Sequence, residues 1–164
     1  MAISEIELRY IVNNIKEVID DIYYISNISL ITKNTLILKF HHSQKNDVSL
    51  LISSFGICIT KYKYSIIEDN DSLKKIKTDL ERSKLIDISV VSGERIVQFV
   101  FQSIQGLKYY LIVELFGHGN IIICNDSHKI LNILNPINVR HRVLLKPGLK
   151  YFPPPSREEL ILYP

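Results

Sequence analysis

Near the start of the chain, apolar residues recur every three or four positions with polar residues between them. This spacing predicts an amphipathic helix from about Ser4 to Asp20 or Asp21. Ser4 and Glu7 have the spacing of a capping box, in which each side chain accepts a hydrogen bond from a free amide of the first turn. The apolar stripe expected to face the core consists of Ile3, Ile6, Tyr10, Ile11, Ile15, Val18, Ile19 and Ile22.

A second helix is predicted over about 72–83, with apolar residues inward and basic residues outward. The inward set is Leu73, Ile76 and Leu80, and the outward set is Lys74, Lys75, Lys77 and Arg82. Most of the remaining chain has the pattern of short strands separated by turn residues, which favours antiparallel meanders over crossover units. The expected strands are 23–31, 35–42, 48–53, 57–63, 85–91, 95–103, 108–116, 120–125 and 129–134.

Length and composition place the chain among globular proteins of one domain. Its 164 residues are 46% hydrophobic and 23% charged, which excludes a disordered chain. The net charge of +3 is compatible with an anionic partner without requiring one. No apolar run reaches the ~18 residues that span a bilayer, and the first residues are acidic where a signal peptide is basic. We therefore expect a cytoplasmic protein that does not enter a membrane.

Cysteine and histidine usage gives no sign of a metal site or a catalytic centre. Cys58 and Cys124 lack the spacing of metal ligands, and we expect both to be buried free thiols. None of the histidines lies in a nucleophile or zinc motif, and the adjacent pair at the end of a predicted strand is expected to be solvated. The histidines are His41, His42, His118, His128 and His141. We expect no metal and no cofactor.

Two charged positions stand out within the second half. Glu94 and Arg95 follow a turn and precede an apolar strand, and adjacent strand residues point to opposite faces, so they cannot simply pair with each other. Glu114 lies inside an otherwise apolar strand, where an unpaired carboxylate is costly. Its donor is Arg95, a turn amide or a ligand, and we favour a structural partner.

The end of the chain changes character. Residues 138–150 carry only basic charges, and the sequence Tyr151-Phe152-Pro153-Pro154-Pro155 predicts a rigid, extended stop. The basic residues are Arg140, His141, Arg142, Lys146 and Lys150. Ser156 to Glu159 then begins another helix. We expect one domain over 1–152, and over 153–164 a proline-rich linker with the start of the next helix of a longer protein.

Three strings of the chain together resemble a known family. They are Gly-Glu-Arg-Ile-Val at 93–97, Leu-Ile-Val-Glu-Leu-Phe-Gly-His-Gly-Asn-Ile-Ile at 111–122, and Gly-Leu-Lys-Tyr-Phe-Pro-Pro-Pro at 148–155. With the opening helix they resemble the NFACT-N domain, also called the fibronectin-binding protein A N-terminal domain, of bacterial RqcH, animal NEMF and archaeal relatives. An archaeal type is expected. The motif residues are Glu114, Gly117, His118, Gly119 and Asn120.

The resemblance implies both a fold and a function. The fold would be α+β, with two antiparallel β-sheets and flanking helices, similar to the N-terminal domain of formamidopyrimidine-DNA glycosylases. The function would be ribosome-associated quality control. Members of the family bind large ribosomal subunits obstructed by peptidyl-tRNA and recruit tRNA, prominently alanyl-tRNA, for template-free tailing of the stalled chain.

The resemblance also suggests site residues. The family's Asp-Arg pair, implicated in tRNA recruitment, aligns with Glu94 and Arg95, and an acidic residue of its opening helix aligns with Glu7; both acids are Glu here instead of Asp. An arginine offers a planar fork for phosphate or base-edge contacts. Basic residues supply phosphate contacts that position RNA without reading its sequence. Those expected to do so lie in the basic segment from Arg140 to Lys150, which includes Arg142 and Lys146, and on the second helix at Lys74, Lys75 and Lys77.

Three other functions stay open at this stage. The glycosylase-like fold raises the possibility of a base-excision enzyme, but Ala2 stands where those enzymes have a proline nucleophile, so we expect neither an enzyme nor a DNA partner. The family's older label suggests a fibronectin-binding surface adhesin, against which the acidic N-terminus argues. The third is a structural protein-interaction domain that makes no direct contact with tRNA.

Overall fold

The computed structural model of this chain describes residues 3–53, 55–91, 93–117, 119–134 and 145–153. Two helices and nine strands lie in these ranges. The elements are α1 (Glu5–Val18), β1 (Tyr24–Thr32), β2 (Thr35–His41), β3 (Val48–Ser53), β4 (Gly56–Thr60), α2 (Asp71–Leu80), β5 (Lys84–Val90), β6 (Ile96–Gln102), β7 (Lys108–Glu114), β8 (Asn120–Asn125) and β9 (Ile130–Ile133). Every helix and strand predicted within these ranges is present, with ends that differ by a few residues, and the helix predicted to begin at 156 lies outside the described residues.

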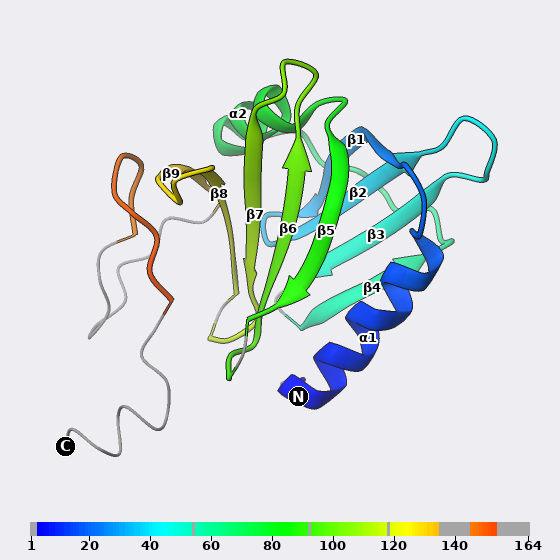
Figure 1. Ribbon diagram of the computed structural model, residues 1–164, viewed down its shortest axis with the longest axis horizontal. Helices are drawn as coiled ribbons and strands as arrows, with labels where there is room; N and C mark the ends of the chain where they lie inside the picture. Colours follow the sequence, from blue (N-terminus) through cyan, green and yellow to red (C-terminus); the bar gives the residue numbers. More distant parts are fainter. Residues whose placement is uncertain (1–2, 54, 92, 118, 135–144, 154–164) are drawn as a thin grey trace.

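The strands form one antiparallel sheet in the order β4-β3-β2-β1-β5-β6-β7-β8-β9. The expectation of two separate sheets is therefore wrong. Two meanders, β1–β4 and β5–β9, are joined where Tyr24 pairs with Lys84, and backbone hydrogen bonds of 2.9 Å flank this pair, from Ile25 N to Ser83 O and from Leu85 N to Tyr23 O. Figure 1 shows β1–β4 strongly inclined to β5–β8. The two meanders meet at this short junction, and the twist of the sheet gives their strands different directions. The sheet nevertheless stays continuous.

Helix α1 spans the two meanders, since it contacts β4 and β5. The Ser4 Oγ accepts a hydrogen bond from Glu7 N at 3.1 Å, which confirms the predicted N-cap. The predicted apolar stripe is partly wrong. Leu8, Val12 and Ile15 are buried, whereas Ile6 and Tyr10 are 81% and 69% exposed. Apolar residues occupy a wide part of the surface of this isoleucine-rich helix, so the sequence is compatible with more than one buried face. In the packed structure the buried face is the one centred on Leu8.

Helix α2 begins after Asn70, whose side chain accepts a hydrogen bond from Leu73 N at 2.8 Å. As predicted, its inward residues are buried; they are Leu73, Ile76 and Leu80. Among the outward lysines, Lys77 forms an ion pair of 2.9 Å with Asp69. The helix contacts β1 and β9 and so covers the opposite end of the sheet from α1 (Figure 1). Neither helix of the described ranges combines the length and apolar character that crossing a bilayer requires.

Apolar side chains form two clusters, one on each face of β6–β8. The larger includes Phe99 and Phe101, whose rings stack 6.1 Å apart, and the buried faces of both helices. The smaller cluster is covered by Leu145 and Tyr151, which belong to the C-terminal described segment, residues 145–153. It consists of Ile96, Ile112, Ile122, Cys124, Ile130, Ile133, Leu145 and Tyr151. Because both faces are covered, β8 is an almost continuous apolar run rather than an alternating one.

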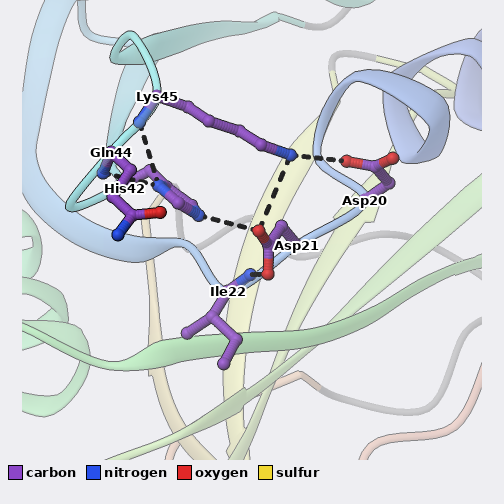
Figure 2. Close-up of polar contacts among 6 residues, drawn as sticks. All are labelled: Asp20, Asp21, Ile22, His42, Gln44 and Lys45. Atoms are coloured by element: carbon purple, nitrogen blue, oxygen red, sulfur yellow. Dashed lines mark hydrogen bonds and ion pairs between the residues drawn. The ribbon is translucent and has the colours of Figure 1, made fainter.

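His42 connects the loop after β2 to the end of the first helix. It is buried, so the prediction of a solvated histidine pair holds for His41 alone. The His42 Nδ1 accepts hydrogen bonds from Gln44 N at 2.9 Å and Lys45 N at 3.0 Å. The proton must therefore be on Nε2, which donates to Asp21 Oδ2 at 2.9 Å. The Lys45 ammonium lies 3.6 Å from the same carboxylate oxygen (Figure 2).

The two cysteines differ in environment. Cys124 is a buried free thiol, as expected, and burial raises its pKa to about 12, so it stays protonated at neutral pH. Cys58 is exposed, which corrects the expectation that both are buried. It occupies an outward position of β4, next to the buried Ile57.

Candidate functional site

The motif strings of the second half meet at one edge of the sheet. The turn between β5 and β6 and the turn between β7 and β8 are joined by a hydrogen bond of 2.8 Å from Leu115 N to Arg95 O. In the strands that leave these turns, Ile96 pairs with Glu114, and Glu114 pairs with Asn120. Figure 1 shows both turns at the lower edge of the sheet, near the N-terminal end of α1. Residues 93–97, 114–117 and 119–120 are thus one structural unit.

A side chain of α1 fixes this edge to the helix. The Glu5 Oε1 accepts a hydrogen bond from Gly93 N at 3.1 Å and also accepts from Arg9 Nε at 3.0 Å and Arg9 Nη2 at 2.8 Å. The hydrogen bonds from Arg9 and then from Gly93 hold the pKa of the Glu5 carboxyl below its usual range. Gly93 has a φ of 78°, a left-handed conformation that favours glycine.

The acid of α1 that contacts the turn is therefore Glu5, and not the predicted Glu7. The predicted residue, Glu7, is exposed and contributes its backbone N–H to the helix cap. The two residues lie two positions apart, so they face different directions on a helix. The contact between Glu5 and the Gly93 turn depends on how α1 packs against the sheet. No local sequence pattern distinguishes Glu5 from Glu7 in this respect.

Arg95 leaves its turn with a half-buried side chain. Its guanidinium makes no hydrogen bond or ion pair with any residue in the described ranges. Glu94 is also half-buried, and no ion pair joins it to Arg95 among the described residues; both lie in the bend that precedes β6. The fork of Arg95 is thus available to a ligand at the edge where both turns and α1 meet.

Glu114 is a buried structural carboxylate. It is 2% exposed, and the Tyr151 hydroxyl donates a hydrogen bond of 2.7 Å to Glu114 Oε2. A structural partner was predicted, but Tyr151 was not among the donors considered, because the extended segment at 151–155 was interpreted as a stop. Tyr151 is in fact buried in the smaller cluster. The contact joins the C-terminal described segment to the edge that carries Arg95.

The glycines of the β7–β8 turn have the tight-turn role that their spacing predicts. Gly117 and Gly119 have φ values of 59° and 74°, and Gly119 N donates to Phe116 O at 3.0 Å. Asn120 is buried, and its Oδ1 accepts a hydrogen bond from Ile121 N at 2.9 Å. His118 lies outside the described residues.

The predicted basic residues are only partly placed. Lys146 is exposed, while Arg140 and Arg142 lie outside the described ranges. On α2, Lys74 and Lys75 are exposed. Within the described part of the chain, no group of three or more histidine, cysteine, aspartate or glutamate side chains has a geometry suited to a metal ion.

Comparison with known proteins identifies the family to which this chain belongs. Residues 5–163 match the family described as NFACT N-terminal and middle domains, so the chain belongs to that family. It is the kind of N-terminal domain found in the RqcH and NEMF ribosome quality-control factors.

The relatives in sequence include an archaeal and a human protein. The archaeal Rqc2 homolog aRqcH of Methanocaldococcus jannaschii is 34% identical over 131 residues, which are 74% of this chain and 18% of the relative. The ribosome quality control complex subunit NEMF of Homo sapiens is 26% identical over 111 residues, 67% of this chain and 10% of that protein. The chain thus spans less than a fifth of the length of these relatives.

Solved structures share the fold. The N-terminal domain of the fibronectin-binding protein PavA from Streptococcus pneumoniae superposes with a TM-score of 0.79 at 26% identity, covering 92% of this chain and 64% of that one. The N-terminal part of the fibronectin/fibrinogen-binding protein from Streptococcus suis gives a TM-score of 0.71 at 23% identity, covering 85% of this chain and 61% of that one. The second likeness concerns the fold alone.

Proposed function

We propose that this chain is the N-terminal domain of a cytoplasmic ribosome-associated quality-control factor. The factor binds large ribosomal subunits obstructed by peptidyl-tRNA, and this domain helps to recruit tRNA, alanyl-tRNA included, for template-free tailing of the stalled chain. Support comes from the family and from relatives named as ribosome quality control subunits. Residues 1–152 form the domain in this proposal, and 153–164 lead into the next part of the protein.

The observation that carries the proposal is the state of Arg95. It combines a half-buried position with the absence of any hydrogen bond or ion pair to the described residues. Guanidinium groups in folded proteins generally find acceptors, and the planar fork suits two oxygens of a phosphate or the O6 and N7 of guanine. A half-buried arginine whose backbone is held by two turns, and whose guanidinium has no partner among the described residues, is suited to an RNA ligand.

The surrounding contacts position Arg95 before a ligand arrives. Its carbonyl accepts from Leu115 N, and the preceding Gly93 is held by Glu5 of α1. The backbone of the turn is therefore already ordered before a ligand arrives, which favours affinity. In this proposal Glu94 accepts a hydrogen bond from a base amine, and Lys146 with Arg140 and Arg142 adds phosphate contacts.

The test is a tRNA-binding measurement on the full-length protein with three variants. Arg95→Ala is expected to weaken binding about 10-fold to 100-fold, the effect of losing one good bidentate contact. Arg95→Lys keeps the charge without the fork and should recover only part of the affinity. Lys108→Ala is the control: it removes an exposed charge at the opposite end of β7 and should bind as the wild type does.

Unchanged tRNA binding by Arg95→Ala, with the fold intact, would favour the rival interpretation of a structural protein-interaction domain. The fibronectin-binding description of the pneumococcal relative gives a second alternative, a role at the cell surface. Recovery of the protein in a surface fraction, without ribosomal subunits, would support that alternative and contradict the proposal.

A further inference from the structure

The C-terminal described segment adds a short edge to the sheet beside the β8–β9 hairpin. Ile130 N donates to Leu149 O and Tyr151 N donates to His128 O, each at 2.8 Å. In this antiparallel pairing Lys129 lies directly opposite Lys150. Residues directly opposite in such a pair have their Cβ atoms about 4.5–5.5 Å apart on the same face. The two lysine side chains therefore leave the backbone side by side on one face.

The folded domain gives no electrostatic reason for this pair. Like charges directly opposite each other destabilise a strand pair. Both lysines are exposed, and neither makes an ion pair with a carboxylate in the described ranges. Asp126 on the same hairpin is exposed and also lacks an ion pair to either lysine within those ranges. A site that concentrates positive charge at a cost to stability is suited to an anionic ligand.

An aromatic ring accompanies the two charges. The Lys150 Nζ lies 5.6 Å from the centroid of the Phe152 ring, which is 47% exposed. Tyr151, between them, points inward to Glu114, so Lys150 and Phe152 share the outer side of this segment. The Lys150 charge also acts on His128, whose pKa is lowered first by burial and then by this ammonium.

We propose that Lys129, Lys150 and Phe152 form an RNA contact distinct from Arg95, in which the lysines bind backbone phosphates and the ring stacks on an unpaired base. The inference rests on the proposed function and adds a second binding surface to it. Cationic side chains beside an exposed aromatic ring are the combination by which proteins hold single-stranded nucleic acid. An acidic protein would need the charges alone, so the ring favours RNA.

The test measures binding of the full-length protein to a single-stranded oligouridylate across about 50–200 mM salt. Each phosphate contact to a single strand contributes about 0.7 to the slope of log K against log salt. Lys129→Gln with Lys150→Gln should therefore lower the slope by about 1.4 and weaken binding roughly 25-fold at 0.1 M salt. Because the variant removes a repulsion, its melting temperature should not fall.

Matched variants separate this contact from net charge and from Arg95. Lys61→Gln with Lys63→Gln removes two exposed charges after β4, and the salt slope should stay unchanged. Phe152→Leu should weaken binding without changing the slope, because stacking releases no counterions. Equal slopes for the Lys129/Lys150 variant and its control would overturn the inference.

Two further results are diagnostic. If the Lys129/Lys150 variant loses binding to polyglutamate but keeps its binding to oligouridylate, the inference is overturned in favour of an acidic protein partner. If Arg95→Ala alone weakens tRNA binding, this second surface fails while the proposed function stands. If the Lys129/Lys150 variant alone weakens RNA binding, the Arg95 role fails and the second surface stands.

Discussion

Tyr151→Phe tests whether the C-terminal segment is fixed to the functional edge by its contact with Glu114. The substitution keeps the ring, and therefore the packing in the smaller apolar cluster, but removes the hydroxyl that donates at 2.7 Å to a carboxylate that is 2% exposed. A hydrogen bond to a charged group contributes about 1.5–3 kcal/mol. At about 2–4 °C per kcal/mol for a domain of this size, the melting temperature should fall by roughly 3–12 °C.

The measurement is the free energy of unfolding in urea, together with a thermal melt of residues 1–164. Tyr62→Phe is the control, because that side chain is 81% exposed and loss of its hydroxyl should change stability by less than about 0.5 kcal/mol. If Tyr151→Phe is as stable as this control, the hydrogen bond does not hold the segment and the reasoning is refuted.

Other contacts give further predictions. His42→Ala should lower the free energy of unfolding by about 2–4 kcal/mol, because it deletes the buried ring together with its half-buried hydrogen bonds to Asp21 and two amides, whereas the exposed His41→Ala should cost below about 0.5 kcal/mol. The Ile22 amide and then His42 lower the pKa of Asp21, so this carboxylate stabilises the fold above its unfolded pKa of about 4 and ceases to do so as pH falls. Asp21→Asn should therefore flatten the acid limb of a stability–pH profile; an unchanged limb would contradict the assignment. Glu5→Gln should raise hydrogen exchange at the Gly93 amide, and unchanged exchange would show that Glu5 does not fix the turn.

Local pattern was sufficient for the elements and insufficient for their assembly. The Ser4 cap, the inward face of α2 and the glycine turn at 117–119 follow from chemistry within a few residues, and each is confirmed. The continuity of the sheet depends on the pairing of Tyr24 with Lys84, two residues far apart in sequence. No periodicity reports such a junction, so nothing local corrected the expectation of two sheets, which came from the family resemblance.

The candidate site shows the same division. The turn that carries Arg95 and the strand that carries Glu114 were selected from their own sequences, since a charge beside or within an apolar strand is locally visible. Glu5 and Tyr151 were not selected because their importance comes from partners 88 and 37 residues away. The burial of His42 likewise depends on the end of α1, so a histidine at a strand end was wrongly expected to be solvated.

The most direct test of the central claim is the amount of tRNA recovered with large ribosomal subunits that are isolated through the full-length protein. The account predicts that Arg95→Ala reduces tRNA recovered per subunit at least several-fold, while Lys108→Ala matches the wild type and all three proteins recover similar amounts of subunit. Equal tRNA recovery by Arg95→Ala and the wild type would contradict the account.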